Sequence, residues 1–146
     1  MHFSNDEEIR DLVWAFETCA IHPGEFKHYQ HLAVALWYVK HFPYAEASEK
    51  MRTGIQRLAA AYGKTGYHET ITLFWLKMVR SFLENGNSRA KIFTLANKLA
   101  SEYGKGAIAE YYSEELLSST KAKNEWVEPD LKSVKEMPTR LPNCER

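Results

Sequence analysis

The sequence has no long hydrophobic run and few cysteines. No apolar stretch approaches the roughly 18 residues that a membrane-spanning helix needs, so we expect no membrane span. The two cysteines, Cys19 and Cys144, are too few for a disulfide framework or a cysteine-based zinc site. The first ten residues are polar and acidic, unlike a signal or transit peptide, and we therefore expect a cytoplasmic protein.

An excess of charge of either sign is also absent. Lysine and arginine total 19, and aspartate and glutamate also total 19, so the formal net charge is zero. A neutral chain has no overall field that draws it to a nucleic acid or an anionic membrane, and we predict neither partner. Hydrophobic residues make up 45% of the 146 residues, which is enough for one core without cross-links. The sequence does not specify an oligomeric state.

Several motifs of catalysis and cofactor binding are missing. There is no dinucleotide fingerprint, and Gly63-Lys64-Thr65 lacks the upstream glycine of a phosphate-binding loop. The His-Glu-x-x-His motif of zinc proteases does not occur. A di-iron bundle needs a Glu-x-x-His pair on each of two helices, and the sequence has a single one, Glu25 to His28, which argues against a site with two metal ions.

What the sequence does contain is helical periodicity. Apolar residues recur every three or four positions, and no useful stretch alternates like a strand. The spacing predicts helices at about 5–20, 26–41, 44–62, 68–84 and 88–103, and a short helix at about 107–118. Because the links are short, we expect an all-α fold, a single antiparallel bundle of five to six helices over residues 1–118. Residues 119–146 are polar and rich in proline, which predicts an extended, irregular tail that packs partly on the bundle.

Three histidines lie on apolar faces of these predicted helices. His28 and His31 are three residues apart and share a face with Leu32. His68 begins the fourth predicted helix and continues an apolar face to Trp75. If the two helices face each other, the three imidazoles meet, and neutral imidazole is a good ligand for iron, zinc or nickel. The spacing therefore predicts a mononuclear site for a divalent transition metal.

Other polar residues near the histidines complete the candidate site. Glu17, on the first predicted helix, is a candidate fourth metal ligand. Glu69 points about 100° away from its neighbour His68 on a helix, so we interpret it as a catalytic acid or base, with Tyr67 beside it. The candidate substrate-binding residues are Thr72, Trp75 and Tyr38.

A metal-dependent enzyme is one of three interpretations. A histidine on an apolar face is more often a hydrogen-bonded core residue than a metal ligand. The same histidine, tyrosine and tryptophan side chains are also suited to a metal-free pocket for a small aromatic or anionic molecule. In the third interpretation, the protein is structural or binds a partner, and the histidines are buried hydrogen-bonding groups.

Three blocks of the sequence resemble an uncharacterised bacterial family of small helical proteins. The blocks are Phe16-Glu17-Thr18-Cys19, His28-Tyr29-Gln30-His31-Leu32 and Tyr67-His68-Glu69-Thr70-Ile71-Thr72. The resemblance covers most of residues 16–131 and emphasises Glu17, His28, His31, Tyr67, His68, Glu69, Thr70 and Thr72. It implies a site at these positions, but it brings no activity.

Overall fold

The computed structural model describes residues 2–87 and 89–134, and every regular element within them is a helix. The five long helices are α1 (Asp6–Glu17), α2 (His28–His41), α3 (Tyr44–Ala61), α4 (Glu69–Phe82) and α5 (Ile92–Glu102). A 3-10 turn, η1 (Pro23–Glu25), precedes α2, and a π-helical turn, η2 (Leu83–Asn87), follows α4. The C-terminal part contains η3 (Lys105–Glu110), α6 (Glu114–Leu117) and α7 (Thr120–Asn124). The prediction of an all-α fold is confirmed.

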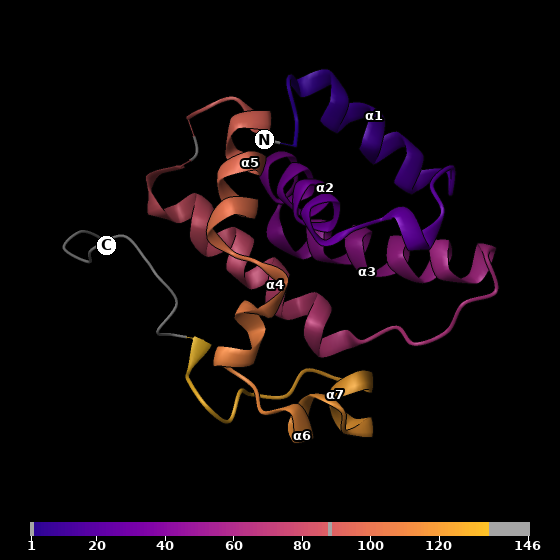
Figure 1. Ribbon diagram of the computed structural model, residues 1–146, viewed down its shortest axis with the longest axis vertical. Coiled ribbons are helices and arrows are strands. Elements are labelled where there is room, and N and C mark those ends of the chain that lie inside the picture. Colours follow the sequence, from indigo (N-terminus) through magenta and orange to yellow (C-terminus); the bar gives the residue numbers. More distant parts are fainter. Residues whose placement is uncertain (1, 88, 135–146) are drawn as a thin grey trace.

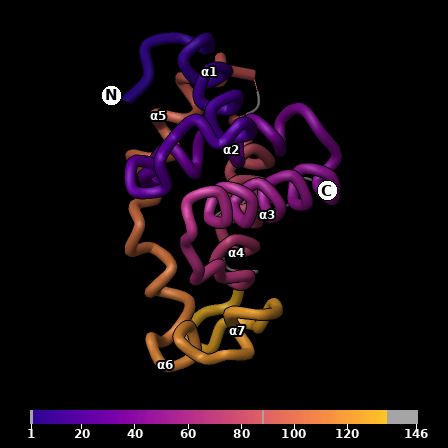
Figure 2. Tube along the Cα trace, turned by 90° about the vertical axis from the view of Figure 1, so that its right-hand side faces the viewer, coloured from indigo at the N-terminus to yellow at the C-terminus, as the bar shows by residue number. Residues whose placement is uncertain are grey.

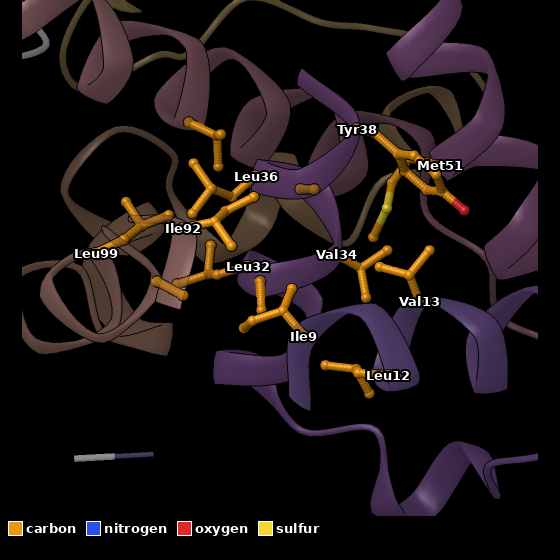
Figure 3. Packing of buried hydrophobic residues seen from close by; sticks show 14 of the residues in the cluster. Ile9, Leu12, Val13, Leu32, Val34, Leu36, Tyr38, Met51, Ile92 and Leu99 are labelled. Carbon is orange, nitrogen blue, oxygen red and sulfur yellow. The ribbon is translucent and has the colours of Figure 1, made fainter. Parts of the chain in front are cut away.

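Helix α2 is the central element of the fold. Figure 1 shows α1, α3, α4 and α5 arranged around it, and all four helices contact it. Five consecutive residues of α2, 32–36, are buried, so this helix is covered on all sides rather than along one apolar stripe. In Figure 3, Ile9 and Val13 of α1 face α2 from one side, while Ile92 and Leu99 of α5 face it from another.

Helices α1 and α3 approach each other closely at a glycine. Gly54 of α3 lies under the ring of Phe16, which is fully buried. A Cβ at position 54 would lie 2.4 Å from a ring carbon of Phe16, closer than two carbons can approach without rearrangement. Glycine at this position therefore sets the spacing between the two helices.

A second, smaller core lies between α4 and the C-terminal segments. Figure 2 shows α6 and α7 together at one end of the molecule. Phe74 and Met78 of α4 pack there against Tyr111 and Tyr112. The hydroxyl of the buried Thr70 donates to the carbonyl of residue 125 at 2.7 Å and accepts from the N–H of residue 127 at 3.2 Å. These bonds fasten the chain after α7 to the first turn of α4.

The C-terminal region differs from the prediction at several points. Residues 107–118 do not form one helix, because the chain turns between η3 and α6 at Ser113. The backbone N–H and hydroxyl of Ser113 donate to the carboxylate of Asp130 at 2.8 and 2.6 Å, and its Oγ caps α6. Residues 120–124 are helical rather than extended. Residues 125–133 are irregular, as predicted, and residues 135–146 lie outside the described residues.

The fifth long helix begins later than predicted, at Ile92 rather than near residue 88. Its first turn is capped from the other end of the chain, where Asp6 Oδ1 accepts the N–H of Phe93 at 2.9 Å.

Across the described residues, none of the helices combines the length and the hydropathy needed to cross a bilayer.

Candidate functional site

A cavity of about 580 Å³ lies between α2, α3 and α4. Most of its wall is apolar or aromatic and consists of Phe26, Leu32, Ala35, Met51, Ile55, Ile71, Trp75 and Leu76. The polar side chains at the cavity belong to Lys27, His28, His31, Tyr67, His68, Thr72 and Lys105. The three histidines singled out in the sequence thus border one cavity, although their helices begin far apart in the chain.

His28, the first residue of α2, is fixed by a backbone carbonyl. Its Nε2 lies 3.0 Å from the carbonyl oxygen of Tyr103, which only accepts, so Nε2 carries the proton and Nδ1 is left as an acceptor. The imidazole also meets the indole of Trp75 edge-on, with ring centroids 4.7 Å apart. Burial lowers the pKa of His28, the bond to Tyr103 opposes this, and the charge of Lys105 lowers the pKa further. The ring is therefore neutral at pH 7.

His31 lies one turn further along α2. Its ring lies against that of Phe26, with centroids 4.0 Å apart. Burial, followed by the charge of His28, lowers the pKa of His31 to about 4, and a hydrogen bond to the backbone of Phe26 acts in the opposite direction. His31 consequently stays neutral throughout the physiological pH range.

His68 is the N-cap residue of α4. Its Nδ1 accepts the N–H of Ile71 at 3.2 Å, which satisfies one of the free amide groups at the helix start. Its Nε2 must then carry the proton, and it donates to the carbonyl oxygen of Leu117 at 2.6 Å. Both ring nitrogens are occupied, and the side chain joins the start of α4 to the end of α6.

Glu69 is a buried carboxylate that does not line the cavity. Arg52 of α3 binds it, with Nε 2.9 Å from Oε2, and the Tyr67 hydroxyl donates to Oε1 at 2.6 Å. Burial and then the hydrogen bond to Glu69 raise the pKa of Tyr67 to about 12. Of the two predicted catalytic residues, only Tyr67 borders the cavity, and Glu69 reaches it only through Tyr67.

The remaining predicted site residues divide into two groups. Thr72 and Trp75, predicted to bind substrate, both line the cavity. Tyr38 and Glu17 do not line the cavity. They lie beside each other, and the Tyr38 hydroxyl donates to Glu17 Oε2 at 2.7 Å. Burial raises the pKa of Tyr38, whereas Glu17 is exposed at the end of α1. The structure therefore does not bring Glu17 together with the three histidines.

The predicted mononuclear metal site would require side-chain positions other than those in the structure. In the described part of the chain, no three histidine, cysteine, aspartate or glutamate side chains are grouped so that they could hold an ion. His68 has no free ring nitrogen, and His28 has only Nδ1. Binding an ion at all three imidazoles would require His68 to give up a hydrogen bond and turn its ring.

Two cationic residues at the cavity were not predicted. Lys27 directly precedes His28, so its place in the sequence could have indicated that it lies at the cavity. Lys105 comes from η3, after α5, and no periodicity relates it to the histidines. Only the packing of α5 against α2 brings it to the site.

Comparison with protein-family models, curated proteins and solved structures gives no match to this chain. The resemblance to an uncharacterised bacterial family therefore stays a prediction.

Proposed function

We propose that this protein binds a small, largely apolar molecule in the cavity between α2, α3 and α4. The observation that carries the proposal is the combination of volume and lining. The cavity of about 580 Å³ falls within the range of small-molecule pockets, which are mostly apolar and carry a few fixed polar groups. Transfer of an apolar ligand from water to such a wall is favourable by roughly 25 cal/mol for each Å² buried.

The histidines suit a binding site because His28 and His31 have lowered pKa values and because hydrogen bonds hold the rings of His28 and His68 in place. The rings of His28 and His68 are each held by a backbone carbonyl, so neither has to lose much freedom when a ligand arrives. Thr72 and Tyr67 add hydroxyl groups to the same wall, and Trp75 adds a flat aromatic surface. Such a wall recognises a ligand by shape and by a small number of hydrogen bonds.

A thermal-shift screen of small molecules tests the proposal. A ligand at one hundred times its Kd stabilises a protein by about 2.7 kcal/mol. For a chain of this size, that stabilisation raises Tm by roughly 5–10 °C. Binding should also change the tryptophan fluorescence of the protein, and this change should be lost in Trp75→Phe, because Trp75 lines the cavity.

A pair of variants assigns any binding to this cavity. Ile55→Trp places a larger side chain at a half-buried position of the wall and should abolish binding. Leu131→Trp makes a similar change at an exposed position away from the cavity and should leave binding intact. The proposal fails if no compound binds saturably, or if Ile55→Trp binds as well as the unchanged protein.

A divalent metal at His28, His31 and His68 is the second candidate, because the three residues border one cavity. It requires the His68 ring to leave its bonds to Leu117 and Ile71. Elemental analysis of protein purified without tag or chelator tests it. About one equivalent of iron, zinc or nickel that is lost in both His28→Ala and His68→Ala would establish the metal site. Metal-free protein that takes up no added ion would exclude it.

A further inference from the structure

The polar groups at the cavity are positive or neutral. Two of its lining residues, Lys27 and Lys105, are cationic, and no aspartate or glutamate among the described residues lines it. Glu69, which directly follows the lining residue His68, is buried and does not line the cavity. Its carboxylate is paired with Arg52 and with the hydroxyl of Tyr67. The lining of the cavity therefore carries positive charge that no lining carboxylate balances among the described residues.

The two cations reach the cavity from separate segments. Lys27 is the N-cap residue of α2, and Lys105 is the first residue of η3. Lys105 is close enough to His28 for its charge to lower the pKa of that imidazole. Both lysine side chains are exposed, so their charges are solvated in the absence of a ligand and cost little to maintain.

The helix dipoles add to this charge. Helices α2 and α4, of 14 residues each, both begin at the cavity, where His28 and His68 line it. The N-terminus of a helix has a partial positive charge, so both helix ends favour an anion over a cation nearby. These features, together with the two lysines and the absence of lining carboxylates, all favour a negatively charged ligand.

We propose that the ligand is an amphipathic organic acid, with its apolar body in the cavity and its carboxylate at the edge between Lys27 and Lys105. This inference rests on the proposed binding function and specifies the class of ligand. The apolar body packs against Leu32, Ile55 and Trp75. The carboxylate forms charge-assisted hydrogen bonds with the lysine ammonium groups, which an uncharged head group cannot form.

A matched pair of probes separates the charge from the apolar body. 2-Naphthoate and 2-naphthalenemethanol have the same ring system and differ in the charged carboxylate. Titrations at low salt, followed by calorimetry, should show that the acid binds about tenfold more tightly. Because the lysines are exposed, the preference should shrink as salt is added.

Substitution of the lysines tests where the preference arises. Lys105→Gln should weaken binding of naphthoate about threefold and leave binding of the alcohol unchanged. The double variant Lys27→Gln, Lys105→Gln should lose most of the preference for the acid and keep only the small part that the helix ends supply. Lys98→Gln, which removes a charge on α5 that instead contacts Asn87, is the matched control and should bind like the unchanged protein.

The outcomes distinguish this inference from the proposed function. If the acid and the alcohol bind equally, or if Lys105→Gln weakens both to the same extent, the cavity binds small molecules but the acid is not selected. If neither probe binds and the thermal-shift screen finds no other ligand, the binding function itself fails and this inference fails with it.

Discussion

Replacing His31 with glutamine should remove a large part of the loss of stability at acid pH. In the folded protein, burial and the charge of His28 lower the pKa of His31 from the ordinary 6.5 to about 4. Between these two values, the unfolded chain binds a proton at this residue and the folded protein does not. The free energy of unfolding therefore falls as the pH is lowered through this window.

The size of the effect follows from the two pKa values. The pKa is 6.5 in the unfolded chain and about 4 in the folded protein. This difference lowers the free energy of unfolding by about 0.2 kcal/mol at pH 7 and by about 2.6 kcal/mol at pH 4.5. His31 thus accounts for a loss of about 2.4 kcal/mol between pH 7 and pH 4.5, out of a total stability on the order of 5–15 kcal/mol. His28, whose pKa is also lowered, adds a loss of the same sign.

Urea unfolding at the two pH values measures this loss. We expect the unchanged protein to lose about 2.4 kcal/mol more than His31→Gln over this range. His31→Leu should show the same reduced pH dependence, although its stability at pH 7 will differ because the packing against Phe26 changes. The reasoning is refuted if both variants keep the full pH dependence, or if the His31 imidazole resonance of the folded protein titrates near pH 6.5.

Three further substitutions test the packing and the hydrogen bonds around the site. Gly54→Ala should destabilise the fold by about 1–3 kcal/mol because the new methyl group meets Phe16, although better helix propensity offsets part of this loss. Calorimetry that shows unchanged or raised stability would contradict this expectation. Thr70→Val should cost about 1–3 kcal/mol because two backbone groups of residues 125–127 lose their partner, and faster amide exchange there is the readout. His68→Ala should cost about 1–3 kcal/mol because a helix cap and a buried hydrogen bond are lost, and a Tm equal to that of the unchanged protein would contradict this structural role.

Helical periodicity predicted the elements of this fold well because it is a local property. The spacing of apolar residues, the cap at Asn5 and the stops at Pro43 and Gly63 are all set by neighbours a few positions apart. The predicted helix of residues 107–118 was wrong because a residue far along the chain, Asp130, binds Ser113 and breaks it. The cap that Asp6 provides for α5 escaped prediction for the same reason.

The sequence by itself determined that the chain is helical and that His28, His31, Thr72 and Trp75 share apolar faces with the core, since residue spacing sets the face of a helix. Tertiary structure decided what these faces enclose. In the folded chain, both ring nitrogens of His68 hydrogen-bond to backbone groups, Glu17 accepts a hydrogen bond from Tyr38, and Lys105 lines the cavity. These pairings depend on how helices cross and on contacts between distant segments, which no local pattern encodes.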